Sequence, residues 1–324
     1  MMNWGIIGTG WAAGDMAAAL NAVNGEVYAV SNPHREHTDD FAAKYHVLHR
    51  YYDNTALMND PQVDIVYIAT PHNQHYELIK QALLAGKHVF CEKAITVTAA
   101  EFDEVAALAQ KRHLILTEGF TLYHMPLYKQ LHQLIAAGKL GTIKMVQVNF
   151  GSLKDPDPRH RYFNRELAGG ALLDIGGYAV AFVRQFLRDL NVAATSVQFY
   201  QTGVDEMAGV VLKNGHEQMA VISLSFRAKQ PKRGVVSGTK GFVEVNNYPR
   251  ADQATVTYTA DAHTATTTTM TAGASDLALQ YEVQDMERYV LQGHDDGELA
   301  MSADIAHLLN EIRVNWGLRF PNDK

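Results

Sequence analysis

The sequence has little cysteine, no excess of basic residues and no long apolar run, and each absence excludes a class of protein. Its 324 residues include one cysteine, Cys91, so an internal disulfide is excluded and a reducing cytoplasm is indicated. The net charge is −7 without a cluster of Lys or Arg, which argues against nucleic acid or an anionic membrane as partner. No apolar run is long enough to span a bilayer, and no signal-like segment opens the chain. We therefore expect a cytoplasmic protein without nucleic-acid or membrane partners.

Apolar residues are plentiful, at 47% of the chain against 19% charged residues, which is typical of a globular protein with a large core. In the first 120 residues, short apolar and β-branched runs alternate with helix-like segments. The predicted strands are 4–7, 26–31, 49–52, 63–69, 87–91 and 114–117. Such alternation predicts a parallel sheet with helices on both faces, so we expect an α/β NAD(P)-binding Rossmann domain over residues 1–120.

The second half has a different pattern. From residue 196 onward, strand-like runs follow one another across short turns, and helix-like segments lie near 127–137, 276–291 and 302–315. We expect an α+β substrate-binding and dimerisation domain over residues 121–324, built on a large, mostly antiparallel sheet. Because an antiparallel sheet commonly leaves one face uncovered, we expect a homodimer or higher homo-oligomer through that sheet.

The turn after the first strand carries Gly8-x-Gly10-x-x-Ala13 and leads into a helix. Gly8 allows a tight turn, Gly10 allows close approach of a pyrophosphate, and Ala13 allows close helix packing. The helix N-terminus would present N–H groups and a positive dipole end to the phosphates. An ordinary tight turn is the alternative. The residues expected at the cofactor here are Gly8, Thr9, Gly10, Trp11 and Ala12.

The end of the second strand bears on the choice of cofactor. A carboxylate at this position would bind the ribose 2′-hydroxyl and select NAD. The residue is Ser31, followed by Asn32 and then by Arg35, and a small hydroxyl with a nearby arginine accommodates a 2′-phosphate. NADP is therefore the preferred cofactor and NAD the alternative; in the other interpretation Arg35 is only a solvated helix-start residue.

Two more segments follow strands of the predicted parallel sheet, at the end where ligands of such sheets bind. The first is the polar loop 70–75, from which we expect cofactor contacts by Thr70, Pro71, Asn73 and His75. The second is Glu92-Lys93, and we expect both residues at the cofactor as well. Two charges are costly at the mouth of a buried strand unless used or paired. Partial desolvation would bring the pKa of Lys93 toward neutrality, as a general acid or base requires, whereas the alternative is a structural ion pair.

The segment 169–178 opens an apolar helix in the second half. Asp174 and Tyr178 are four residues apart and would share one helix face. They are either a functional pair or a buried pair that is internally hydrogen-bonded.

Taken in order, these motifs resemble the Gfo/Idh/MocA oxidoreductases, the family of glucose–fructose oxidoreductase and inositol dehydrogenase. The branch it resembles most holds dimeric dihydrodiol dehydrogenase and NADP-dependent xylose dehydrogenase. The resemblance covers nearly the whole chain. Its segments are Gly8-x-Gly10-x-x-Ala13, Ala69-Thr70-Pro71 with His75, 85–93 ending in Glu92-Lys93, 138–141, 169–178 and 238–241.

This resemblance implies hydride transfer between a nicotinamide and a carbinol carbon of a sugar, polyol or vicinal diol. It implies that Lys93 is the catalytic lysine, that Tyr178 is the acid/base tyrosine, and that Asp174 holds substrate hydroxyls. A neighbouring ammonium lowers a phenol's pKa, so Tyr178 would take the hydroxyl proton as hydride leaves.

Three positions depart from the family pattern. Ala94 stands where the family has proline, which predicts a looser Glu92-Lys93 turn. Asn32 stands where the branch has arginine, which weakens the case for NADP. Tyr123-His124 replaces an arginine, which predicts a changed substrate pocket.

Two other classes compete with this one. A non-catalytic NAD(P)-binding sensor of the same fold would not need Lys93, Asp174 and Tyr178 together. The 15 histidines occur in pairs on separate loops and lack convergent metal-ligand spacing, so we expect no metal site.

Overall fold

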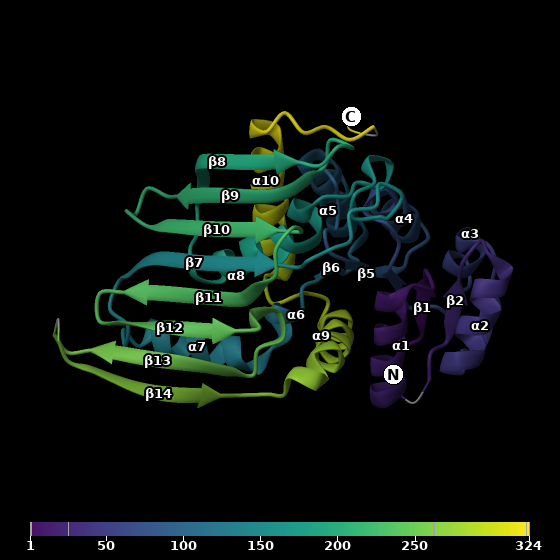
Figure 1. Cartoon of the computed structure of the whole chain (residues 1–324). Helices are drawn as coiled ribbons and strands as arrows, with labels where there is room; N and C mark the ends of the chain where they lie inside the picture. The colour runs from purple at the N-terminus through teal and green to yellow at the C-terminus, as the bar shows by residue number, and fades with distance from the viewer. Residues whose placement is uncertain (1, 25, 262, 322, 324) are drawn as a thin grey trace. The chain divides into compact units, whose positions relative to one another are not determined.

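In the computed structural model of the chain, residues 2–24, 26–261, 263–321 and 323 are described. The chain divides into two compact units (Figure 1). The first unit is Met1–Gly119 with Leu279–Ala303, and the second is Phe120–Ala278 with Asp304–Lys324. The sequence predicts one division, near residue 120; in the structure the chain also returns to the first unit before it ends in the second.

The first unit is built on a six-stranded parallel sheet, in the order β3-β2-β1-β4-β5-β6, which confirms the predicted Rossmann architecture. Gly5 of β1 pairs with Ala29 of β2 on one side and with Val66 of β4 on the other. The strand order reverses between β1 and β4, and ligands of open α/β sheets bind at the carboxyl ends of the strands at this point. The strands are β1 Trp4–Ile7, β2 Ala29–Ser31, β3 His49–Tyr51, β4 Ile65–Ile68, β5 His88–Glu92 and β6 Leu116–Gly119.

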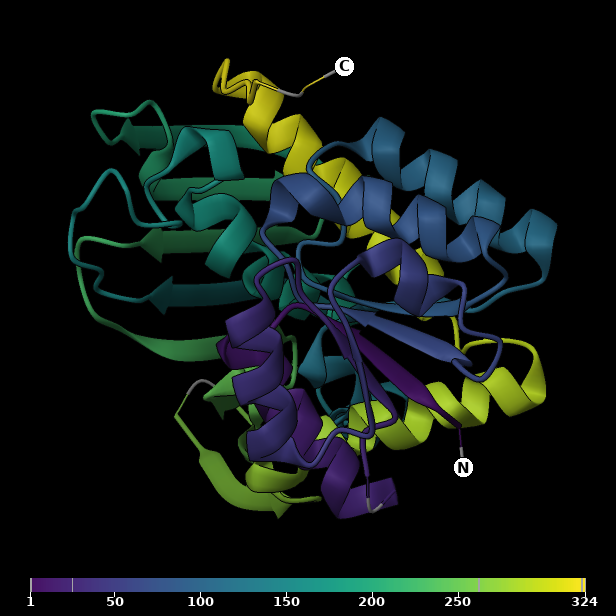
Figure 2. The same ribbon diagram turned by 90° about the vertical axis from the view of Figure 1, so that its right-hand side faces the viewer.

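Helices cover this sheet, and local sequence signals fix their ends. Thr98 and Glu101 form a capping box at the start of α5, whereas left-handed residues end α2 and α5. The helices are α1 Trp11–Asn24, α2 Arg35–Tyr45, α3 Asn54–Met58, α4 His72–Leu84, α5 Ala99–Arg112 and α9 Ala278–Gln292. Although α9 comes late in the chain, it lies beside the N-terminal strand β1 (Figure 2). Its Val283, Met286 and Tyr289 belong to the same hydrophobic core as Trp4 and Phe90.

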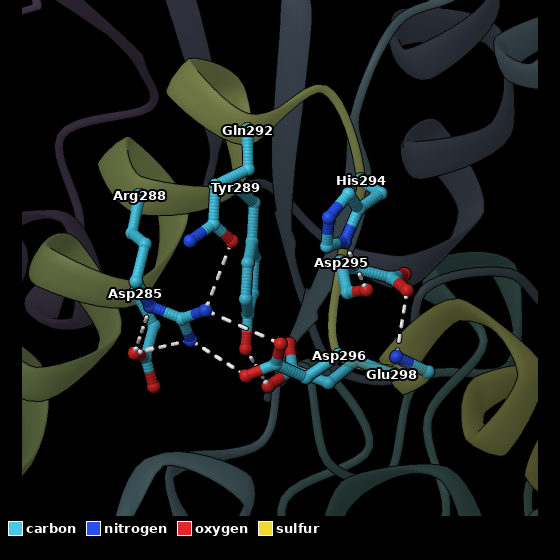
Figure 3. Close-up of polar contacts among 9 residues, drawn as sticks. Asp285, Arg288, Tyr289, Gln292, His294, Asp295, Asp296 and Glu298 are labelled. Carbon is cyan, nitrogen blue, oxygen red and sulfur yellow. Dashed lines mark hydrogen bonds and ion pairs between the residues drawn. The ribbon is translucent and has the colours of Figure 1, made fainter.

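An ion-pair network joins α9 to the start of α10, Glu298–Asn315 (Figure 3). The Arg288 guanidinium donates to Asp285 at 2.8 Å and to Asp296 at 2.7 Å. The Tyr289 hydroxyl donates to the buried Glu298 carboxylate at 2.6 Å. These contacts fix the turn from which α10 begins.

The second unit contains an eight-stranded sheet in the order β14-β13-β12-β11-β7-β10-β9-β8 (Figure 1). Only the β7–β10 pair is parallel among these strands, so the predicted mostly antiparallel sheet is confirmed. The strands are β7 Ile143–Gly151, β8 Asn191–Phe199, β9 Asp205–Lys213, β10 Met219–Ser225, β11 Gln230–Gly238, β12 Gly241–Asn246, β13 Gln253–Thr259 and β14 Ala265–Thr271.

The helical segments of this unit include a long apolar one. They are α6 Thr121–His124, α7 Pro126–Ala136, η1 Arg165–Leu167, η2 Leu172–Gly176, α8 Gly177–Phe186, η3 Tyr248–Arg250 and η4 Ser275–Leu277. The sequence predicts no membrane-spanning run, yet Arg165–Phe186 is long and apolar enough to cross a bilayer by length and composition. Because 83% of its apolar window is buried inside the structure, it has the character of a core helix.

Candidate functional site

The turn after β1 has the backbone geometry that its glycines predict. Gly8 has φ +109°, and a Cβ there would lie 2.4 Å from the carbonyl oxygen of Ala69 on the neighbouring strand. A Cβ on Gly10 would meet no heavy atom within 4 Å, so the outer side of the turn is open. Helix α1 begins directly after, at Trp11, whose side chain is exposed. An open turn at a helix N-terminus fits a dinucleotide pyrophosphate.

The end of β2 lies beside this turn. The Asn32 side-chain amide donates to Thr9 Oγ1 at 3.0 Å, which links the two predicted cofactor segments. Ser31 is completely buried, and its hydroxyl donates to Asn54 Oδ1 at 2.8 Å. The Ser31 carbonyl accepts from the Gly8 amide at 2.9 Å, so Ser31 contacts the turn through its backbone. Asn32 and Arg35 are the more accessible predicted groups here.

Arg35 is exposed but held in place by an aromatic ring. Its guanidinium carbon lies 3.9 Å from the centroid of the Tyr52 ring, within the range of a cation–π contact. The Tyr52 hydroxyl in turn donates to Asp39 at 3.0 Å. Arg35 thus has an aromatic contact at the start of α2, and both interpretations of this residue stay open.

His75 joins the loop after β4 to the turn that carries Lys93. Its Nδ1 lies 2.9 Å from the carbonyl oxygen of Ala94, and its Nε2 lies 2.9 Å from that of Thr70. The sequence predicts that His75 contacts the cofactor, but the structure buries the ring completely between these two carbonyls. Burial lowers its pKa. His75 thus contacts the backbone of the two segments that carry Thr70 and Lys93. Pro71 and Asn73 lie at the start of α4 and are partly exposed.

The Lys93 turn is braced on its other side by Glu118 of β6. The Glu118 carboxylate accepts from the Ile95 backbone amide at 2.9 Å, and Tyr67 donates to Glu92 at 2.6 Å. The Lys93–Ala94 peptide bond is cis, and Ala94 is buried. The Ala94 carbonyl faces His75 and the Ile95 amide donates to Glu118, so the backbone that follows Lys93 has two side-chain contacts. The looser turn expected from Ala94 stays a prediction.

The sequence analysis does not single out Glu118, although an acid inside an apolar strand is a usable signal. Burial raises the pKa of Glu118 to about 7, against the lowering effect of Ser302, the Ile95 amide and Lys93. A group that titrates near neutrality thus lies beside the predicted catalytic lysine.

In the second unit, Asp174 and Tyr178 lie around a junction of two helix types. The sequence predicts an α-helical face shared by both, but Leu172–Gly176 is a π-helical turn and α8 starts only at Gly177. Such turns are rare and occur frequently at functional sites. The Asp174 Oδ1 lies 3.6 Å from Arg161 Nη2, and the Tyr178 hydroxyl lies 3.3 Å from Thr121 Oγ1.

Arg161 is a second residue that the sequence analysis does not single out. Its guanidinium lies 4.2 Å from the centroid of the Tyr162 ring and donates to the Tyr162 hydroxyl at 3.1 Å. The ring therefore fixes the cation beside Asp174, whose side chain is largely buried.

Asp205 holds the start of this helical segment. Its Oδ2 accepts from the Leu172 amide at 2.6 Å, and a Cβ on Gly170, where φ is +121°, would lie 2.2 Å from its Oδ1. Burial raises the pKa of Asp205 to about 7 although backbone amides lower it. The second glycine of the Gly169-Gly170 pair is thus required for this carboxylate to reach the helix start.

Tyr123 and His124, the departure expected to change the substrate pocket, are both buried in α6. The Tyr123 ring packs edge-on against Phe120 at 5.5 Å.

The fold and the open glycine turn define a class, the dinucleotide-binding oxidoreductases with a Rossmann unit. Residues 2–120 match the family model described as the Gfo/Idh/MocA oxidoreductase family with an NAD-binding Rossmann fold, and residues 128–244 match its C-terminal domain. The chain belongs to the Gfo/Idh/MocA family and is an enzyme, an NAD(P)-dependent oxidoreductase.

Relatives of known function agree with this assignment. The chain is 34% identical over 251 residues to human (Homo sapiens) trans-1,2-dihydrobenzene-1,2-diol dehydrogenase, covering 76% of this chain and 75% of that one. The Xenopus laevis protein of the same name is 27% identical over 331 residues, covering 98% and 99%. A solved structure of a 3-ketoreductase from Actinomadura kijaniata, in complex with NADP and TDP-benzene, is 25% identical with a TM-score of 0.87 over 97% of both chains.

Proposed function

We propose that this enzyme transfers hydride between NADP and a carbinol or carbonyl carbon of a sugar, polyol or vicinal diol. The observation that carries the proposal is the joint presence of Lys93, Asp174 and Tyr178 in a chain of this family, each at its motif position. A sensor of the same fold would have no use for this set. The names of the relatives support a diol or sugar-like substrate.

The roles of the three residues follow from their chemistry. Bound NADP supplies the hydride acceptor. In the direction of alcohol oxidation, the carbinol C–H bond breaks and its electron pair leaves as hydride, while the Tyr178 phenolate takes the hydroxyl proton and the C=O bond forms. The Lys93 ammonium lowers the pKa of the phenol, and Asp174 accepts hydrogen bonds from substrate hydroxyls. Reduction reverses each of these transfers.

The preference for NADP rests on the end of β2. No carboxylate stands there to bind a ribose 2′-hydroxyl, and Arg35 presents an exposed cation for a 2′-phosphate. Asn32, which stands where the branch has arginine, is tied to Thr9 and contributes an amide instead of a second cation.

We further propose that the second unit binds substrate and forms a homo-oligomer through its sheet, in the cytoplasm. Strand register places Met145, Met219 and Phe242 on one face, because Met145 pairs with Met219 and with Ser237, which pairs with Phe242. Met219 is 44% exposed and Phe242 is 37% exposed, and apolar side chains gathered on one face favour an interface.

The first test is a fluorescence titration of the purified protein with NADPH and, separately, NADH. Binding of NADPH at lower concentration than NADH is expected, followed by turnover in a screen of trans-1,2-dihydrobenzene-1,2-diol, aldoses, inositols and other vicinal diols. Binding without turnover of any of these would favour the sensor, and binding of neither nucleotide would contradict the whole proposal.

A further inference from the structure

Thr121 lies at the start of α6 and contacts the phenol of Tyr178. Its side chain is 1% exposed and has two polar contacts, both within the second unit. The Thr121 hydroxyl donates to the carbonyl oxygen of Pro249 at 2.5 Å, and its oxygen lies 3.3 Å from the Tyr178 hydroxyl. One buried hydroxyl thus stands between the proposed acid/base group and a backbone carbonyl.

The direction of these hydrogen bonds follows from proton counting. A carbonyl oxygen can only accept, so the single hydroxyl proton of Thr121 is committed to Pro249. Thr121 can then only accept from Tyr178, and the phenolic O–H donates to it. A hydrogen bond made by the O–H group favours the protonated phenol over the phenolate, which has no proton to donate.

Other contacts restrict how the phenol can move. The edge of the Phe120 ring packs against Tyr178 with centroids 5.2 Å apart. Within this unit, the titratable or charged groups on Tyr178's own helical segment are Asp174 and Arg184. Those on the elements it contacts are Tyr123 and His124 on α6, and Tyr248 and Arg250 on η3. Among these neighbours, Thr121 is a non-titratable group, and its oxygen forms a hydrogen bond with the phenol.

We propose that Thr121 is a positioning residue for Tyr178: in the resting enzyme its hydroxyl oxygen accepts a hydrogen bond from the phenolic O–H and so favours the protonated tyrosine. The catalytic meaning of this contact rests on the acid/base role proposed above for Tyr178. Thr121 acts through Tyr178 and does not itself exchange a proton with the substrate.

The test compares Thr121→Val, which keeps the shape and removes the hydroxyl, with Thr121→Ser, which keeps the hydroxyl. The holoenzyme with bound NADP is labelled with 3-fluorotyrosine, and the fluorine resonance of residue 178 is identified by its loss in Tyr178→Phe. We expect the pKa of Tyr178 to fall by about 0.5 to 1 unit in the valine variant, the size of one lost neutral hydrogen bond, and to stay unchanged in the serine variant. An unchanged or higher pKa in the valine variant overturns the proposal, as does an equal fall in both variants.

A kinetic measurement shows whether the contact matters for turnover. We compare the pH profiles of kcat/KM for oxidation of trans-1,2-dihydrobenzene-1,2-diol by NADP in the wild type and in Thr121→Val. The rise of this profile should shift to lower pH in the variant, by the same amount as the pKa of Tyr178 falls. The positioning role is overturned if the fluorine titration gives a lower pKa for Tyr178 in an active Thr121→Val enzyme but the pH profile of kcat/KM does not shift. The fluorine titration needs no turnover, so it tests the Thr121 contact even if the wild-type protein does not transfer hydride. An inactive wild-type protein would therefore contradict the proposed function and not the contact. Loss of the Pro249 contact also reduces folding stability, so NADPH binding is used to check that the valine variant is folded. If that variant binds less than one NADPH per chain, Thr121→Ala replaces it in both measurements.

Discussion

The Nδ1 of His75 lies 2.9 Å from the carbonyl oxygen of Ala94, the residue that follows the proposed catalytic lysine. The other ring nitrogen faces Thr70, so one buried imidazole spans two loops at the carboxyl edge of the parallel sheet. The position of Lys93 therefore depends on a side chain that would not itself touch the substrate.

His75→Ala is expected to reduce both stability and turnover. Removing the ring leaves a cavity and takes the donor from one buried carbonyl, because the neutral imidazole has a single N–H; this should lower the free energy of unfolding by about 2–4 kcal/mol. The kcat should fall about tenfold as the Lys93 turn loosens. Urea unfolding and steady-state kinetics measure both effects, with the exposed His37→Ala as the matched control. Equal kcat values in the two variants would show that Lys93 does not depend on this brace.

Lys93→Met and Tyr178→Phe test the acid/base assignment directly. Each should lower kcat by about 10²–10⁴-fold, the range of general acid–base catalysis, because proton transfer loses its partner. NADPH binding, measured by fluorescence, should survive in both variants. Near-full activity in either would remove that residue from the mechanism.

Arg35→Ala tests the cofactor preference. Loss of the cation held over Tyr52 should weaken NADPH binding about tenfold or more while NADH binding stays the same, because only NADPH carries the 2′-phosphate. Arg112→Ala, an exposed arginine of the same unit, is the control for a general change of charge. Equal weakening of both nucleotides would place Arg35 outside the 2′-phosphate site.

Glu118→Gln is expected to change how the free energy of unfolding depends on pH. The pKa of Glu118 is raised from 4.5 to about 7 by burial, so the folded protein holds this proton more tightly than the unfolded chain does. Ionisation therefore costs stability progressively between pH 4.5 and 7, up to about 3.5 kcal/mol at about 1.4 kcal/mol per pKa unit. Glutamine keeps an acceptor for the Ile95 amide and does not ionise.

The measurement is urea unfolding of wild type and variant at pH 5 and pH 8. The variant should gain stability relative to wild type as the pH rises, whereas the exposed Glu26→Gln should track wild type at both values. A constant difference between wild type and Glu118→Gln would mean that the carboxyl does not titrate in this range. Asp205 ionises in both proteins and cancels from the comparison.

Periodicity and turn chemistry were sufficient to predict the parallel and antiparallel sheets, because strand runs and their glycine turns are local signals. The same holds for Gly8, whose positive φ and close approach to Ala69 follow from the motif. Glu118, Arg161, Thr121 and Asp205 could not be found in this way, because each acts on a segment far away in the sequence. The π-helical turn at Leu172–Gly176 was missed because residue spacing alone does not distinguish it from α-helix.

The return of α9 to the first unit has a consequence for how the protein is made. Its Val283, Met286 and Tyr289 complete the core that contains Trp4 and Phe90. When only the Rossmann strands and the helices α1–α5 have been synthesised, the core around Trp4 and Phe90 still lacks the apolar side chains of α9. Since domains generally fold as units during synthesis, the nucleotide-binding unit can complete its core only after nearly the whole chain has been made.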